Sequence, residues 1–201
     1  MRIIFRTAVV ATAALALVAC NNKKGATDLN QDMGMGNTKA PVTVIEYASV
    51  TCPHCAAFNK DVFPQFKAKY IDTNKIHYVF RETPIHGAYD VTGFLLARCA
   101  GPDKYFKVVD AIMRDQEHVF ADPRGAYLAI AESAGLNEKQ FDACENDQTA
   151  TKKFLDRTKA EAAEYGVDST PTFIVNGKTM PPGETTLDAL SAEIDPLLAK
   201  K

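Results

Sequence analysis

The sequence of 201 residues has almost no charge imbalance, with a formal net charge of -2 at pH 7. Electrostatic binding of nucleic acid needs a clustered excess of Lys and Arg, and a disordered acidic tail needs a run of Asp and Glu. The sequence contains neither, so we expect no nucleic-acid partner. No internal repeat is visible, and the length fits one packed domain, or one domain with an insertion.

The sequence also lacks an apolar run that could comfortably span a membrane. The apolar stretch Thr7 to Ala19 is short and follows Arg2 and Arg6, which is typical of an export signal. The residues LVAC, which end at Cys20, resemble the lipobox of bacterial lipoproteins. We predict a lipoprotein signal peptide over residues 1-19 and lipidation of Cys20, with an unlipidated cut nearby as the alternative. The protein would then lie on the periplasmic side of a bacterial membrane.

The segment after this cysteine lacks hydrophobic periodicity. Residues 21-40 are polar and rich in Asn and Gly, a composition typical of a flexible linker. We therefore predict that residues 20-40 form a lipid-anchored cysteine and a flexible tether.

A second pair of closely spaced metal ligands is missing as well. Cys52 and Cys55 are two residues apart, but His77, His86 and His118 stand alone in the sequence. Because a closed zinc site usually needs two ligand pairs, we predict no metal site and no cofactor. A carrier that binds a metal through Cys and His remains the alternative from a different functional class.

Cysteines other than Cys20 are even in number, namely Cys52, Cys55, Cys99 and Cys144. In an exported protein they can form two disulfides, and four cysteines allow three pairings. The close spacing of Cys52 and Cys55 favours these two as partners. Cys99 and Cys144, which lie 45 positions apart, are then predicted to form a structural disulfide. Two buried small side chains or a regulatory redox pair are the alternatives.

Hydrophobic patterns predict a β-α-β unit, a helical region and a second β segment. Residues 41-49 read as a buried strand, residues 52-71 as a helix kinked at Pro64, and residues 75-82 as a strand. Three or four amphipathic helices fit residues 89-164, with Asn137 as one N-cap. A Pro-led strand with an Asn-Gly turn follows at residues 169-178, then a short strand near 178-180 and a final helix.

This order resembles the thioredoxin fold, an α/β fold, with an inserted α-helical domain. More narrowly, it resembles the DsbA family of exported thiol:disulfide oxidoreductases over about residues 40-200. The motifs that carry this resemblance are the active-site tetrapeptide Cys52-Pro53-His54-Cys55, the step Thr170-Pro171, and Glu46 six residues before Cys52. The resemblance implies a thioredoxin-fold domain of residues 41-88 plus 162-201 and a helical insertion of residues 89-161.

The residues themselves indicate redox chemistry at Cys52. A sulfur in the first turn of a helix meets unpaired backbone N–H groups and the positive end of the helix dipole, which stabilise a thiolate. Pro53 suits this turn because it has no N–H to leave unpaired, and His54 can add a positive charge or a hydrogen bond. A client thiolate would attack Cys52 of the disulfide with Cys55 as the leaving group, and the stabilised thiolate would make the disulfide a strong oxidant.

Two further positions gain a role from the resemblance. Glu46, a carboxylate in a buried strand, matches the family's buried acid and would exchange a proton with Cys55; a rim residue paired with a lysine is the alternative. Pro171 would follow a cis bond and present the backbone to an extended client, or would simply start an edge strand. Thr170 replaces the Val of the best-known oxidases, which leaves oxidising strength and partner recognition open.

These patterns together predict an exported enzyme that introduces disulfides into envelope proteins. The resemblance implies recharging by a DsbB-like, quinone-linked membrane protein. A reductase or isomerase is the alternative within the same chemistry, and a purely structural Cys52–Cys55 disulfide is a further one. Known exported isomerases carry an added dimerisation domain, for which residues 21-40 are too few, so the oxidase is preferred.

Overall fold

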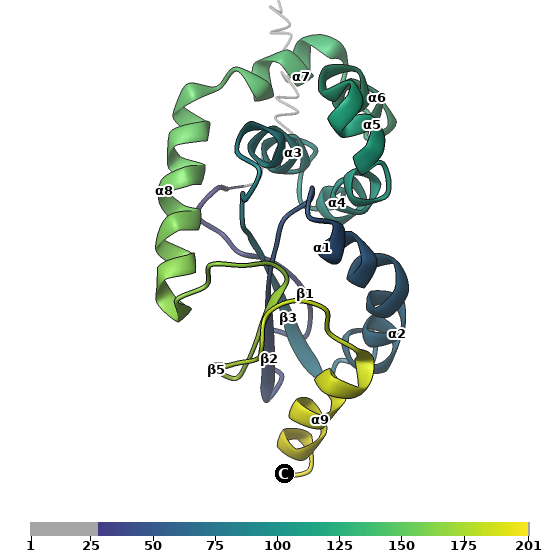
Figure 1. The fold of residues 1–201 in the computed structure, drawn as a ribbon, viewed down its shortest axis with the longest axis vertical. Helices are drawn as coiled ribbons and strands as arrows, with labels where there is room; N and C mark the ends of the chain where they lie inside the picture. Colours follow the sequence, from purple (N-terminus) through teal and green to yellow (C-terminus); the bar gives the residue numbers. More distant parts are fainter. Residues whose placement is uncertain (1–27, 201) are drawn as a thin grey trace, which may run out of the picture.

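The structure is a computed structural model that describes residues 28–200 (Figure 1). The predicted signal peptide, the predicted lipidation site Cys20 and the start of the predicted tether lie outside the described residues. In Figure 1, α1, α2 and α9 lie on one side of a central sheet and α8 on the other, while α3 to α7 gather above it. Within the described part, no helix is both long enough and apolar enough to cross a bilayer.

The sheet has five strands in the order β1-β3-β2-β4-β5. Its centre is the parallel pair β2 (Val42–Ala48) and β3 (Ile76–Glu82), and every other pairing is antiparallel. β4 (Thr172–Val175) and β5 (Lys178–Thr179) form the hairpin that the Asn-Gly turn predicts. Six of the seven β2 residues are buried, which explains why this strand reads as a nearly continuous apolar run.

The prediction of a flexible tether up to residue 40 is wrong for its last part. β1 (Met33–Gly36) is an edge strand that pairs with β3, and Met33 is buried. A Cβ at Gly34 would lie 2.8 Å from the Tyr78 carbonyl oxygen, and one at Gly36, where φ is +84°, would lie 2.5 Å from that of Ile76. The glycines that suggest flexibility in the sequence are therefore what lets this backbone approach β3.

The predicted helix after β2 is present as one helical run over residues 53–71. It comprises α1 (Pro53–Ala57), the wide turns η1 (Phe58–Val62), α2 (Phe63–Phe66) and the wide turns η2 (Lys67–Ile71). Pro64 lies between the two π-helical stretches, as expected where a residue without a backbone N–H interrupts the hydrogen-bond ladder.

The middle of the chain is helical, as predicted, but is divided more finely. Its helices are α3 (Ala88–Cys99), α4 (Tyr105–Arg114), α5 (Gln116–Ala121), α6 (Pro123–Ser133), α7 (Glu138–Glu145) and α8 (Gln148–Tyr165). Asp147 caps α8 and separates it from α7, so one expected helix is two. The short helix α5, which Asp115 separates from α4, was not expected. Because α8 runs past residue 162, the predicted boundary of the insertion falls inside a helix.

The C-terminal helix α9 (Leu187–Leu198) buries Leu190 and Ile194 on the same side of the sheet as α2. One large hydrophobic core extends from the sheet into the helical part, while Ile45, Tyr47, Val79 and Ile174 form a smaller cluster on the other face. The large core includes Val44 of the sheet and Ile130 of α6, so the sheet and the helical part share one interior.

Candidate active site

Cys52 lies between the end of β2 and the start of α1. It is the N-cap of α1, with an extended backbone (φ -76°, ψ 123°), and Pro53 occupies the first turn. The backbone N–H groups of His54 and Cys55 help to lower the pKa of Cys52, as a helix start allows. The local sequence therefore places one sulfur over unpaired N–H donors.

The two sulfurs differ in environment although they lie three positions apart. Both are free thiols, with Cys52 4% exposed and Cys55 fully buried. The pKa of Cys52 is lowered to about 5, first by a hydrogen bond from the Cys55 thiol and then by Thr170 and the backbone N–H groups, against the effect of burial. Burial, followed by the interaction with Cys52, raises the pKa of Cys55 far above its usual range. The pair holds a stable thiolate beside a stable thiol.

His54 has a different place from the one its motif predicts. Its Nδ1 lies 3.2 Å from Glu184 Oε1, at the surface, with 59% of the His54 side chain exposed. The His54 backbone N–H, and not its ring, helps to lower the pKa of Cys52. Glu184, which sequence reasoning missed, comes from the loop before α9 and carries no motif that could have identified it.

The Thr170–Pro171 peptide bond is cis, and its loop lies against the reactive sulfur. The Cys52 Sγ is 3.5 Å from the Thr170 carbonyl oxygen. The Thr170 hydroxyl is buried and has no hydrogen-bond partner in the described chain. The structure thus brings Cys52 and this loop together across 118 positions of sequence.

Glu46 lies below the cysteines in the middle of β2. It is 2% exposed, faces Phe80 and Phe173 on the neighbouring strands, and accepts a hydrogen bond of 2.6 Å from the Tyr78 hydroxyl. The alternative of a rim residue paired with a lysine is wrong, since the carboxylate is buried. Burial raises the pKa of Glu46 to about 7, and the Tyr78 hydrogen bond opposes this rise. The charge of Glu46 also helps to raise the pKa of Cys55.

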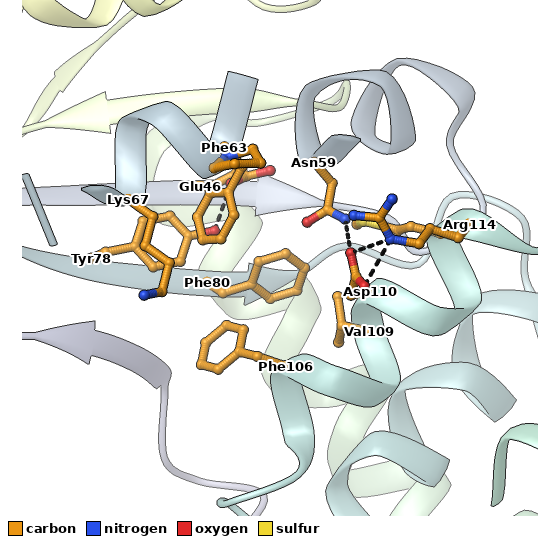
Figure 2. A pocket seen from close by; sticks show the side chains of 12 residues that line it. Glu46, Asn59, Phe63, Lys67, Tyr78, Phe80, Phe106, Val109, Asp110 and Arg114 are labelled. Atoms are coloured by element: carbon orange, nitrogen blue, oxygen red, sulfur yellow. Dashed lines mark hydrogen bonds and ion pairs between the residues drawn. The ribbon is translucent and has the colours of Figure 1, made fainter. Parts of the chain in front are cut away.

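A cavity of about 220 Å³ reaches Glu46 from the side of the sheet (Figure 2). It lies between the helical run after Cys52 and α4. Figure 2 shows the rings of Phe63, Phe80 and Phe106 around it, with Asp110 on its α4 side. Sequence reasoning did not predict this space, because it depends on how α4 packs against the first helix.

A buried polar network supports the loop that precedes Cys52. The Asp90 carboxylate accepts hydrogen bonds from the Ser49 and Thr51 hydroxyls at 2.7 and 2.9 Å and from the His86 backbone N–H at 2.7 Å. In addition, Gln116 Nε2 donates to the carbonyl oxygen of Cys52 at 3.1 Å. None of these residues was predicted. Asp90 looks in the sequence like an ordinary acid in the first turn of a helix, and Gln116 begins α5, a helix that was not expected.

Cys99 and Cys144 form a disulfide in the structure, with an S–S distance of 2.08 Å and a Cα–Cα distance of 6.3 Å. The bond joins the end of α3 to α7 and lies outside the Cys52 site. Over residues 28–200, no group of three or more His, Cys, Asp and Glu side chains has the arrangement of a metal site.

The known proteins that this chain resembles agree with one another in family and fold. Residues 28–196 match the thioredoxin family described as Thioredoxin. A Rickettsia conorii protein that bears the provisional name protein-disulfide oxidoreductase is 35% identical over 175 residues, which make up 86% of this chain and 62% of that protein. The chain thus spans about three fifths of that relative. The crystal structure of Wolbachia pipientis alpha-DsbA1 superposes with a TM-score of 0.76 at 29% identity, covering 85% of this chain and 92% of that one. BdbD from Bacillus subtilis has a TM-score of 0.75 at 22% identity, covering 87% of this chain and 97% of that one, and supports the fold.

Proposed function

The chain belongs to the thioredoxin family, as a DsbA-like member of it, and on this premise we propose that it is a protein disulfide oxidoreductase that oxidises client thiols through Cys52 and Cys55. The observation that carries this proposal is the opposite displacement of the two thiol pKa values. A reduced form stabilised as a thiolate makes the corresponding disulfide easy to reduce, and therefore oxidising toward clients.

The reaction proceeds in two exchanges. A client thiolate attacks the Cys52 sulfur of the Cys52–Cys55 disulfide, forms a mixed disulfide and displaces Cys55 with the electron pair of the broken bond. A second client thiolate then attacks the client sulfur of that mixed disulfide and releases Cys52 as a thiolate. The client loses two electrons and the enzyme gains them. The described state, with two free cysteines, corresponds to the enzyme after this reaction.

Glu46 supplies the proton that the displaced sulfur needs. Cys55 is fully buried and its thiolate is unfavourable, so it must take a proton as it leaves. With a pKa of about 7, Glu46 is partly protonated at neutral pH and can both give and take this proton. When the enzyme is reoxidised, the proton would return from the Cys55 thiol to Glu46.

The loop around Pro171 is the surface that we assign to the client backbone. The Thr170 carbonyl oxygen lies 3.5 Å from the reactive sulfur, so an extended client segment held along this loop brings its own sulfur to Cys52. The clients would be reduced or wrongly paired envelope proteins. Export, the lipid anchor at Cys20 and recharging by a DsbB-like, quinone-linked membrane protein complete the proposal and rest on the N-terminal sequence and on the resemblance.

A redox titration of the full chain tests the direction of the reaction. Thioredoxin-fold proteins span reduction potentials from about -120 mV for strong oxidants to about -270 mV for reductants. We expect a potential nearer the oxidising end, and faster oxidation of a reduced dithiol peptide than reduction of insulin. A potential near -270 mV would instead favour the reductase or isomerase alternative. The presence of Thr170 in place of the Val of the best-known oxidases would agree with that outcome.

Trapping of reaction intermediates tests which sulfur meets the client. The Cys55→Ser variant, mixed with a client that carries a disulfide, should accumulate mixed disulfides through Cys52, because Cys52 attacks the client disulfide and no resolving thiol remains. The Cys52→Ser variant is the matched control and should accumulate none, since Cys55 is fully buried. Equal trapping by both variants would contradict the assigned roles.

A further inference from the structure

We propose that Gln116 and Asp90, which both come from the inserted helices, are positioning residues that hold the loop of residues 49–52 and thereby set the redox equilibrium of the Cys52–Cys55 pair. Neither side chain takes part in the exchange of disulfides itself. This inference rests on the proposed function, in which clients are oxidised through these two cysteines. It gives the helical insertion a task, because side chains outside the thioredoxin-fold domain would adjust the chemistry that this domain carries.

Gln116 holds two carbonyl groups of the loop. It is the first residue of α5, and its Nε2 donates to the carbonyl oxygen of Val50 at 2.9 Å and to that of Cys52 at 3.1 Å. A side-chain amide has two N–H donors, so it can serve both oxygens. The Cys52 carbonyl oxygen also accepts the backbone N–H of Ala56 at 3.0 Å, as in a first helical turn. Gln116 therefore fixes the loop at the residue where the helix begins.

Asp90 holds the alternate residues of the same loop. Its carboxylate is fully buried and accepts hydrogen bonds from the Ser49 hydroxyl at 2.7 Å and from the Thr51 hydroxyl and backbone N–H at 2.9 and 3.2 Å. The His86 backbone N–H donates to its second oxygen at 2.7 Å. A buried carboxylate is costly without such donors, so Asp90 and the loop keep each other in place.

The loop held in this way carries groups that act on the two sulfurs. The backbone N–H groups of His54 and Cys55 help to lower the pKa of Cys52, and their direction follows from the position of the Cys52 backbone. The Ser49 backbone acts on the pKa of Cys55 in the same direction. Because a hydrogen bond weakens as its distance and angle depart from the optimum, a small shift of this loop would reduce these contributions.

The reduced form depends on this geometry more than the oxidised form does. The Cys52 thiolate is a charged group that hydrogen-bond donors stabilise, whereas a disulfide carries no charge. Loss of Gln116 should therefore weaken the reduced form selectively, raise the pKa of Cys52 and make the disulfide a weaker oxidant. While Cys52 is ionised, each unit by which its pKa rises corresponds to a tenfold change in the redox equilibrium.

Substitution of Gln116 in the full-length chain tests the proposal. Gln116→Met removes both N–H donors but keeps an uncharged side chain of similar length, and Gln148→Met makes the same change at an exposed position of α8. We expect Gln116→Met to raise the pKa of Cys52, read from its alkylation rate, by about one unit. The equilibrium constant for oxidation of glutathione by the Cys52–Cys55 disulfide should fall about tenfold, which corresponds to about 30 mV. Gln148→Met should change neither quantity.

Unfolding of the two redox forms separates positioning from a general loss of stability. By linkage, a tenfold change in the redox equilibrium means that Gln116→Met costs the reduced chain about 1.4 kcal/mol more than the oxidised chain in urea unfolding. A residue that only supported the fold would destabilise both forms equally. The difference between the two forms is therefore the readout that a purely structural role does not move.

Thr51→Val tests the side of the loop that Asp90 holds. It removes the hydroxyl that donates to Asp90 while keeping the shape of the side chain, and Thr149→Val at an exposed position of α8 is its control. The pKa of Cys52 and the redox equilibrium should shift in the same directions as in Gln116→Met. Wild-type values in Gln116→Met and Thr51→Val, or equal losses of stability in both redox forms, would overturn the proposal.

The two proposals fail separately, because this test compares variants with the wild type. A wild-type potential near that of thioredoxin, about -270 mV, would contradict the proposed oxidase. The tenfold difference between Gln116→Met and the wild type would still be measurable in such a protein.

Discussion

At the scale of single residues, the site separates two chemically identical thiols by their surroundings. Cys52 accepts hydrogen bonds from backbone N–H groups and from the Cys55 thiol, which favour its anion. Cys55 has a buried environment and a carboxylate nearby, which favour its neutral form. We expected the helix start and His54 to stabilise the Cys52 thiolate, yet the Cys55 thiol makes the largest contribution to its lowered pKa.

The first prediction concerns alkylation of the reduced enzyme. Because the pKa of Cys52 is about 5, its rate of reaction with iodoacetamide should reach half its maximum near pH 5 and stay high above it. The Cys55→Ala variant should shift this midpoint upward, since the hydrogen-bond donor at the Cys52 sulfur is then removed. A midpoint between pH 8 and 9, as for cysteine in an unfolded peptide, would contradict the site described here.

The second prediction concerns Glu46 and the stability of the fold. Its ordinary pKa of 4.5 applies to the unfolded chain, and the folded value is about 7. Between these values the folded state keeps a proton that the unfolded state has released, so stability falls as pH rises. At 1.36 kcal/mol per pH unit, the loss is about 3 kcal/mol above pH 7.

Glu46→Gln, which stays neutral, should therefore be more stable than the wild type by up to about 3 kcal/mol at pH 8 and about equal to it at pH 4. Urea unfolding at the two pH values measures this difference. Glu132→Gln, at an exposed position on α6, is the control away from the cysteines. A Glu46→Gln difference that did not depend on pH would show that the carboxyl group titrates normally.

At the scale of elements, the sequence patterns predicted those helices, strands and turns that depend on neighbouring residues in the chain. β2, β3, the Asn-Gly hairpin and the helix after Cys52 follow from strand composition, turn residues and apolar spacing. Asn137 begins α7 with a capping box, as its pattern indicates. β1 was missed because its pairing depends on glycines that approach another strand, and α5 because its six residues are too few to show an apolar period. The Asp90 network and the cavity depend on packing between elements and have no local signal.

The third prediction concerns the loop that carries Thr170. Its buried hydroxyl has no hydrogen-bond partner among the described residues. Thr170→Val should therefore stabilise the fold by about 1 kcal/mol, since an unsatisfied polar group is removed. Thr172→Val makes the same change two positions later, at the start of β4, but removes a hydrogen bond of 2.8 Å to the Ser169 carbonyl oxygen. It should destabilise the fold by about 1 kcal/mol and leave the Cys52 alkylation profile unchanged.

The fourth prediction concerns the bond between α3 and α7. The disulfide closes a loop of 45 residues, which by chain entropy corresponds to about 4 kcal/mol of stability. The double variant Cys99→Ala with Cys144→Ala should lose about this amount in denaturant unfolding. Its Cys52 alkylation profile should not move, because the bond lies outside that site. A variant of wild-type stability would show that the unfolded chain is already compact there.

At the scale of the whole molecule, the predicted architecture is confirmed as a thioredoxin fold with an inserted helical part. A buried ion group joins the two parts. Glu82 at the end of β3 receives hydrogen bonds from Arg98 at 2.8 Å and from Tyr105 at 2.7 Å, and it also pairs with Arg157 of α8. Arg98 further donates to the carbonyl oxygens of Asp28 and Gln31. One arginine thus fixes the N-terminal segment, the sheet and α3 together.

The fifth prediction follows from this group. Arg98→Met leaves the Glu82 carboxylate buried with fewer partners, so the variant should lose about 3 to 5 kcal/mol in thermal or urea unfolding. Arg124→Met is the matched control, because Arg124 also binds carboxylates, but at the surface, with 50% of its side chain exposed. It should lose no more than about 1 kcal/mol. Similar losses in the two variants would mean that burial does not strengthen the Arg98 group.

The shortness of the outermost strands has a consequence for the proposed work on unfolded clients. β1 has four residues and β5 has two, and they border the sheet on its two sides. A long, flat border would recruit extended polypeptides through their main chain and seed fibrous aggregates. Because the two border strands leave few backbone groups unpaired, the proposed client would bind beside the Cys52 sulfur and not at an edge of the sheet.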